Sequence, residues 1–147
     1  MGKYKSVFFD LNGTLWDSHG CGNYVLNVVV PRLEEHLPEV NRDDIVSSLN
    51  AALLDIVCEE GLKGADNLTY SRRFEKLLES YDIHDRGLVR ELSSQAQSAR
   101  RLSLRAFMPE NLHRLLKRLK EARLTLGVIA DGTPAVQRHV LNSLGLM

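Results

Sequence analysis

Two short strand patterns, far apart in the sequence, constrain the fold more than any other feature. The first covers residues 5–9, and the second covers residues 124–130. Both are rich in β-branched, aromatic or aliphatic residues, and each is followed closely by an acidic residue and a glycine. Short apolar runs of this kind are typical of strands that are buried on both faces of a sheet.

The long segment between the two strands has helical periodicity. Apolar residues recur at three- and four-residue spacings, which predicts helices near 21–37, 42–60, 68–80, 86–103 and 109–122. Asn41 or Asp43 is expected to cap the second helix, and Pro109 to lie in the first turn of the fifth. Loops are expected at 62–67 and 81–85. Because parallel neighbouring strands need a crossover connection, this order predicts an α/β fold with a helical insertion.

Composition excludes several classes of protein. The chain of 147 residues is 44% hydrophobic, and its 19 basic residues balance its 19 acidic ones, which argues against nucleic-acid binding through bulk charge. No apolar run approaches the ~20 residues of a membrane span, and the N-terminus lacks the features of a signal peptide. The two cysteines have no metal-ligand spacing. We therefore expect a cytoplasmic protein that binds neither nucleic acid nor membrane.

The residues that follow the first strand carry the strongest functional signal. Asp10 lies at the carboxyl end of that strand, where open α/β sheets bind ligands. The turn at Gly13-Thr14 offers backbone N–H groups and a hydroxyl to an oxyanion. At the second strand end, Thr133-Pro134 provides a capping residue and a proline at the start of a final helix, which is expected to stop at Gly145.

The segment from Phe8 to Ser18 resembles motif I of the haloacid dehalogenase superfamily, whose phosphatases read D-x-D-G-T-L. Residues 126–132 look like motif II, and the separation of the two fits the subgroup with a helical (C1-type) cap inserted after motif I. The resemblance implies a partial Rossmann-like core, residues 1–16 and 106–147, with an all-α cap over residues 17–105. Motifs III and IV are expected after residue 147, which would leave this core incomplete.

The resemblance also implies the roles of individual residues. Asp10 matches the nucleophile that forms an aspartyl-phosphate, and its carboxylate with the backbone carbonyl of Asn12 would hold Mg²⁺. The expected substrate is a small phosphorylated metabolite. Its phosphate would lie among residues of both motifs: Leu11, Gly13, Thr14, Ala130, Asp131, Gly132 and Thr133.

Two departures from the family pattern predict impaired catalysis. Asn12 stands where phosphatases have an Asp that protonates the leaving group and activates water. An amide cannot donate and take back a proton at neutral pH. Ala130 replaces the usual hydroxyl of motif II, and Asp131 adds a negative charge beside the anion site. Thr133 is a candidate substitute for that hydroxyl.

These departures leave other functions open. One alternative is a non-catalytic relative, or a half-protein, that serves binding or assembly, with self-association or a separate chain completing the core. A further alternative is a haloacid dehalogenase, although that chemistry places an aromatic residue at the position of Asn12.

Residues outside the motifs have simpler expected roles. Trp16 and Cys21 are expected to pack at the root of the cap, and His19 to lie in a loop, with a cleft-facing position as its alternative. The pairs Arg72-Arg73 and Arg100-Arg101 are expected on solvated helix faces, unless one of these arginines reaches an anionic substrate.

Overall fold

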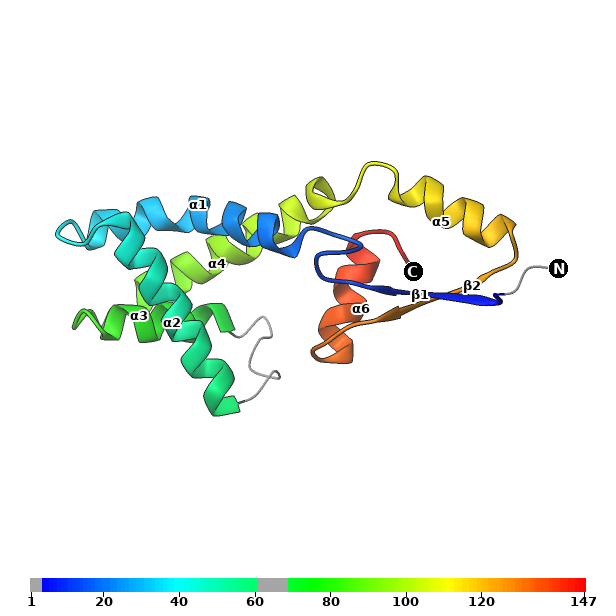
Figure 1. Cartoon of the computed structure of the whole chain (residues 1–147). Helices are drawn as coiled ribbons and strands as arrows, with labels where there is room; N and C mark the ends of the chain where they lie inside the picture. Colours follow the sequence, from blue (N-terminus) through cyan, green and yellow to red (C-terminus); the bar gives the residue numbers. More distant parts are fainter. Residues whose placement is uncertain (1–3, 61–68) are drawn as a thin grey trace.

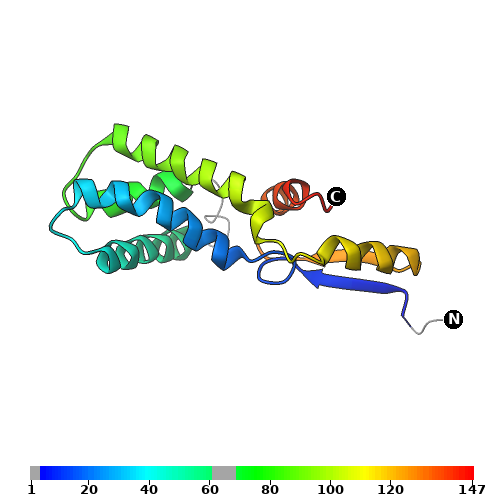
Figure 2. The same ribbon diagram turned by 90° about the horizontal axis from the view of Figure 1, so that it is seen from above.

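The computed structural model of the chain describes residues 4–60 and 69–147. It is an elongated molecule with a helical bundle at one end and a two-stranded sheet at the other (Figures 1 and 2). Its elements in chain order are β1 (Ser6–Asp10), α1 (Ser18–His36), α2 (Arg42–Glu60), α3 (Thr69–Glu79), α4 (Arg86–Ser103), the 3-10 helix η2 (Leu104–Phe107), α5 (Leu112–Glu121), β2 (Thr125–Ile129) and α6 (Pro134–Ser143).

The two strands pair in parallel, as the sequence predicts, with α5 as the crossover helix. The register places Phe8 opposite Gly127 and Asp10 opposite Ile129, so both strands end at the same edge of the sheet. A Cβ on Gly127 would lie 2.5 Å from the Phe8 ring. The ring therefore lies against the bare backbone of the neighbouring strand, a space that only glycine leaves open.

Helices α1 to α4 form a bundle with its own hydrophobic core. Phe74 of α3 is 1% exposed and is the largest of the fully buried side chains. The other buried residues come from all four helices and the α1–α2 connection: Val25, Val29, Val30, Leu33, Leu37, Ile45, Leu49, Leu77, Leu78, Leu88, Leu92, Ala96 and Ala99. We call this bundle the cap.

A second core lies where the cap meets the sheet. It joins residues of the turn after β1, the start of α1, η2, α5 and α6: Leu11, Leu15, Trp16, Cys21, Leu104, Leu112, Val140 and Leu144. Cys21 and Trp16 are buried there, and the Cys21 thiol lies 3.3 Å from the Ser103 hydroxyl at the end of α4. The first and last helices of the cap are thus joined at its root.

Several predicted boundaries are wrong. Helix α1 begins at Ser18 rather than residue 21, because the Asp17 side chain caps it by accepting from the backbone N–H of Gly20. Helix α5 begins at Leu112, so Pro109 precedes the helix instead of lying in its first turn. Of the two candidate caps of α2, Asn41 accepts from the backbone N–H of Asp44. The predicted loop at 62–67 lies outside the described residues.

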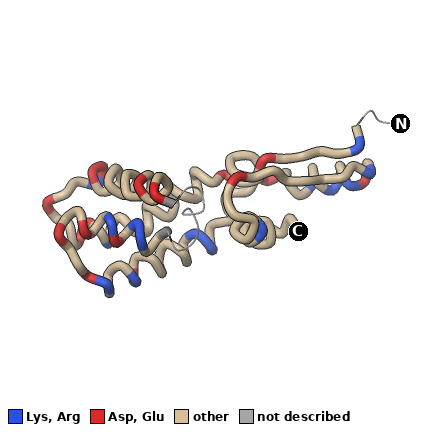
Figure 3. Tube along the Cα trace, turned by 90° about the horizontal axis from the view of Figure 1, so that it is seen from below, with Lys and Arg blue, Asp and Glu red and all other residues tan. Residues whose placement is uncertain are grey.

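Charges of both signs are interspersed on the cap, whereas α5 carries a series of basic residues (Figure 3). Within residues 4–60 and 69–147, no helix is both long enough and apolar enough to cross a membrane.

Candidate functional site

The carboxyl ends of the two strands bring the two sequence motifs together. Asp10 ends β1 directly beside Ile129, and residues 130–133 follow β2 at the same edge of the sheet. The turn that leads into α1 and the first residues of α6 both start from this edge (Figure 1). Motifs that lie far apart in the sequence therefore share one sheet edge.

Asp10 is an exposed carboxylate held by its own turn. The Thr14 hydroxyl donates a hydrogen bond of 3.0 Å to Asp10 Oδ2. Backbone N–H groups of Thr14, Leu15 and Trp16 all point to the Leu11 carbonyl, at 3.3, 3.0 and 3.3 Å. The Thr14 hydroxyl in this compact turn therefore holds the carboxylate through Oδ2. The other oxygen, Oδ1, has no hydrogen bond within the described part of the chain.

The side chain of Asn12 is engaged by the same turn. The indole Nε1 of Trp16 donates to Asn12 Oδ1 at 3.1 Å, and Trp16 itself is only 4% exposed. Gly13 closes the turn by donating its N–H to the Trp16 carbonyl at 2.8 Å, with a left-handed φ of 79°. Trp16 is therefore more than the packing residue that the sequence predicts, because it also orients the amide next to the carboxylate.

Leu11 contributes only its backbone to this region, since its side chain is fully buried in the second core. The Asp10 carboxylate and the backbone carbonyl of Asn12 are the two oxygen donors that the motif I resemblance implies for Mg²⁺. Within the described residues no three His, Cys, Asp or Glu side chains gather closely enough to hold a metal ion. Two hard oxygen donors nonetheless fit Mg²⁺, which usually keeps several water ligands and takes one or two protein carboxylates.

The second motif turns sharply into α6. Gly132 has a φ of 102°, which favours glycine, and the Gln137 side chain donates to the Asp131 carbonyl across this turn. Thr133 is the N-cap residue of α6, but its side chain makes no capping hydrogen bond. Ala130 is half-buried beside the second core. The hydroxyl proposed to replace that of motif II thus lies at a helix N-terminus, where anions are stabilised.

Further polar groups line a pocket between three helices of the cap. His19 lies in the first turn of α1, not in a loop as expected, and lines a pocket of about 260 Å³ between α1, α2 and α3. Arg73 lines the same pocket. Its guanidinium donates to the Leu49 carbonyl at 2.8 Å and to Asn50 Oδ1 at 3.0 Å.

Arg73 is not on a solvated helix face, contrary to the sequence prediction. Burial lowers the pKa of its guanidinium, and burial also raises the pKa of the neighbouring Tyr70, although Arg100 and Arg73 act in the opposite direction on that tyrosine. The sequence signal that marks Arg73 is its position one turn after Tyr70 on a strongly amphipathic helix. Arg72, by contrast, pairs with Glu59 at 3.3 Å near the surface.

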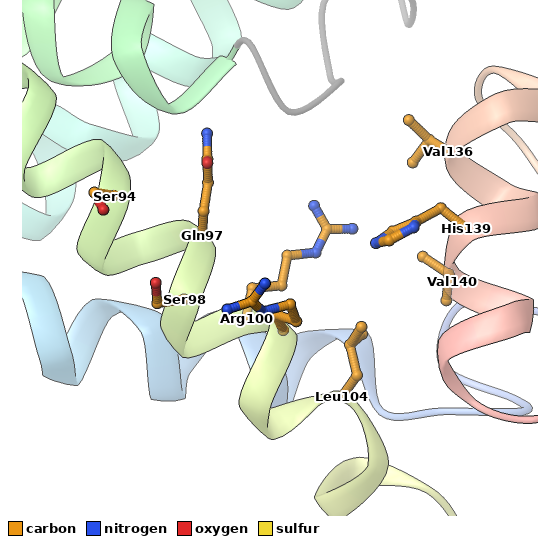
Figure 4. Close-up of a pocket in the computed structure, with 9 residues that line it drawn as sticks. Ser94, Gln97, Ser98, Arg100, Leu104, Val136, His139 and Val140 are labelled. Atoms are coloured by element: carbon orange, nitrogen blue, oxygen red, sulfur yellow. The ribbon is translucent and has the colours of Figure 1, made fainter.

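A second pocket, of about 230 Å³, separates α4 from α6. Arg100 and Arg101 line it from the last turn of α4. His139 lines it from α6, and Figure 4 shows Arg100 and His139 on the two helices that border the space. Sequence reasoning gave no role to His139, because the pairing of these two helices depends on how the cap meets the sheet.

Comparison with known proteins agrees with the motifs. The family model for haloacid dehalogenase-like hydrolases matches residues 4–147. Among solved structures, the magnesium-bound HAD-hydrolase YfnB from Bacillus subtilis matches with a TM-score of 0.60 at 18% sequence identity. The match covers 99% of this chain and 60% of that chain, so the present chain spans about three fifths of the length of YfnB. No curated protein matches the chain.

Proposed function

Because the chain belongs to the haloacid dehalogenase-like hydrolases, we propose that it is a phosphatase of small phosphorylated metabolites that uses Asp10 as the nucleophile. The observation that carries the proposal is the exposed Asp10 carboxylate at the end of β1, with one oxygen held by Thr14 and the other without a hydrogen bond in the described chain. A positioned carboxylate of this kind can split phosphate transfer into two easier steps.

The first step transfers the phosphoryl group from the substrate to Asp10. Oδ1 attacks phosphorus, the bond from phosphorus to the substrate oxygen breaks, and an aspartyl-phosphate and an alkoxide result. The alkoxide takes its proton from solvent, because the Asn12 amide has no acidic proton to give. The α6 N-terminus and Thr133 stabilise the negative charge of the phosphoryl oxygens.

The second step returns Asp10 to its free state. Water attacks phosphorus, the acyl-phosphate bond breaks, and inorganic phosphate leaves. This step needs a base to take a proton from water, and Asn12 cannot act as that base. Mg²⁺, held when bound by the Asp10 carboxylate and the Asn12 carbonyl, would neutralise charge on the phosphate.

Hydrolysis of p-nitrophenyl phosphate with Mg²⁺ tests the proposal. We expect slow turnover by the chain, no turnover by Asp10→Asn, and an increase of about 10²–10⁴-fold in Asn12→Asp, since that is the usual contribution of general acid–base catalysis. Turnover that persists in Asp10→Asn would show that another group is the nucleophile. Fast turnover by the unaltered chain would refute the role of Asn12 as the limiting residue.

A second candidate function, assembly through the sheet, is favoured by a different observation. Phe8 and Ile129 expose 62% and 68% of their surfaces on the two strands. Large apolar side chains on a strand pair are typical of a surface that another polypeptide covers. We propose that a second copy of the chain covers it, and the test is given below.

A further inference from the structure

The amide of Asn12 is held by a neighbour that can only donate. The indole N–H of Trp16 has no acceptor capacity, so the atom 3.1 Å from it is the amide oxygen of Asn12. Trp16 is 4% exposed, and its burial keeps this donor in place. The amino group at the other end of the amide has no hydrogen bond within residues 4–60 and 69–147. Asn12 therefore offers a ligand N–H donors and no acidic proton.

The two segments that leave the sheet edge supply no replacement acid. Residues 10–18 and 130–134 contain no Lys, Arg or His, and their acidic residues are Asp10, Asp17 and Asp131. The Asp17 side chain caps α1 by accepting from the backbone N–H of Gly20 at 2.8 Å. His19, the next titratable residue along the chain, lines the pocket between α1, α2 and α3. These segments thus bring carboxylates to the strand ends, and carboxylates accept protons rather than donate them.

The absence of an acid in these segments determines which leaving groups can depart. Attack of Asp10 Oδ1 breaks the bond from phosphorus to the bridging oxygen, and the electron pair of that bond stays on the leaving group. An alkyl ester would release an alkoxide, a base about as strong as hydroxide, which needs a proton as it forms. An acyl phosphate would release a carboxylate, the anion of an acid whose pKa is about 4, which needs none.

Energy and charge distinguish an acyl phosphate from other donors with a stable leaving group. The aspartyl-phosphate is itself an acyl phosphate, so its formation from another acyl phosphate exchanges bonds of the same kind. A diphosphate would leave as a multiply charged anion at an edge to which both segments contribute carboxylates, and like charges at short range repel. A departing carboxylate carries a single charge.

We infer that the phosphoryl donor is an acyl phosphate, the mixed anhydride of phosphate and a small carboxylic acid. The inference deepens the proposed function and rests on it, because it needs Asp10 as the nucleophile. Asp10 Oδ1 forms the new bond to phosphorus, the bridging bond breaks, and the acid leaves as a carboxylate with no proton transferred. The free amino group of Asn12 donates a hydrogen bond to an oxygen of that carboxylate.

Acetyl phosphate and ethyl phosphate form a matched pair for the test, since a carbonyl oxygen in one replaces two hydrogens in the other. With protein in excess of donor, the rate of donor consumption that is lost in Asp10→Asn reports the first step alone. Acetyl phosphate is the more reactive donor in water as well, so the deciding quantity is the effect of Asn12→Asp on each rate. We expect the rate with ethyl phosphate to rise about 10²–10⁴-fold and that with acetyl phosphate to stay within about threefold.

Two controls accompany this comparison. Asn142→Asp adds the same charge at an exposed position near the end of α6, and its rates with both donors should equal those of the unaltered chain. Inorganic pyrophosphate tests the argument from charge, and we expect the unaltered chain to consume it at least about tenfold more slowly than acetyl phosphate.

The outcomes separate this inference from the proposed function. Equal acceleration of both donors in Asn12→Asp, or a pyrophosphate rate that matches the acetyl phosphate rate, would overturn the inference. Consumption of p-nitrophenyl phosphate that depends on Asp10, with acetyl phosphate left intact, would refute the acyl phosphate and leave the phosphatase standing. If no donor is consumed in a manner that depends on Asp10, both the inference and the proposed function fail.

Discussion

At the scale of single residues, the proposed chemistry depends on the turn that holds Asp10 and Asn12. The Trp16 indole donates to the Asn12 oxygen, an atom that an aspartate also has at the same place. An aspartate at position 12 would therefore keep this hydrogen bond and gain a second oxygen for proton transfer. For this reason we expect Asn12→Asp to fold like the unaltered chain, so that its change in rate reports on chemistry.

The Thr14 hydroxyl provides a second test at this scale. Replacing Thr14 by Val keeps the shape of the side chain and removes the hydrogen bond to Asp10 Oδ2. A hydrogen bond to a charged group contributes about 1.5–3 kcal/mol, so the rate of Asp10 phosphorylation should fall at least about tenfold. The control is Thr125→Val at the exposed start of β2. Equal rates for Thr14→Val and the control would show that Thr14 does not position the nucleophile.

The sequence was sufficient to predict which backbone positions meet, but not how their side chains pair. Asp10 and Ala130 share a sheet edge because parallel strands end together, a rule that needs only the two strand patterns. The bond from Trp16 to Asn12 depends on side-chain rotamers within one turn, and local spacing does not determine these. The burial of Arg73 likewise depends on the packing of α2 against α3.

At the scale of elements, helix ends carry their own electrostatics. Asp85 caps α4 by accepting from the N–H groups of Gly87 and Leu88, at 2.8 and 3.0 Å. These backbone hydrogen bonds, that from Leu88 foremost, lower the pKa of the Asp85 carboxyl in the folded chain.

Because the pKa is lower in the folded than in the unfolded chain, the charged form stabilises the fold. The contribution is complete well above the usual aspartate pKa of about 3.9 and is lost as the pH falls towards the lower, folded value. Asp85→Asn keeps the cap and removes the charge. In urea unfolding, we expect the stability difference from the unaltered chain to shrink as the pH falls from neutral to about 3. A stability difference that stays constant between neutral pH and about pH 3 would contradict this account.

Helix ends were predicted unevenly. The bounds of α2 and α4 agree with the expected ranges 42–60 and 86–103, whereas the starts of α1 and α5 do not. Ends depend on single hydrogen bonds, such as the one from Gly20 to Asp17, which starts α1 three residues earlier than the periodicity indicates. Pro109 can begin a helix by its φ angle, but here a turn separates it from α5.

At the scale of the whole molecule, the cap and the sheet differ in how well they bury apolar surface. The cap has a continuous core of its own, whereas Phe8 remains largely exposed on the sheet. Burial of exposed apolar surface lowers the free energy by about 25 cal/mol per Å². The unpaired backbone groups of an edge strand can also form hydrogen bonds with a strand of another chain. This contrast supports the proposal that two copies of the chain associate through their sheets.

Light scattering on a matched pair of variants tests that association. Phe8→Lys should shift the chain towards the monomer, because a charged side chain opposes burial of the sheet face. Leu54→Lys is the control, since Leu54 is exposed to a similar degree, 64%, but lies on the cap. Mass action favours the dimer as the concentration rises. A chain that stays monomeric across a concentration range of about a hundredfold would therefore contradict the proposed association.

The central claim, that Asp10 accepts a phosphoryl group which Asn12 cannot help to remove, has one most direct measurement. After incubation with p-nitrophenyl phosphate and Mg²⁺, mass spectrometry of acid-quenched peptides locates any added phosphoryl group. Nitrophenolate leaves without a proton, so the first step proceeds without an acid, whereas the second still lacks a base. We predict a phosphoryl group on Asp10 that accumulates in the unaltered chain, falls in Asn12→Asp and is absent in Asp10→Asn. Release of phosphate with no phosphoryl group on Asp10 in any of these chains, or a phosphoryl group that survives in Asp10→Asn, would contradict the claim.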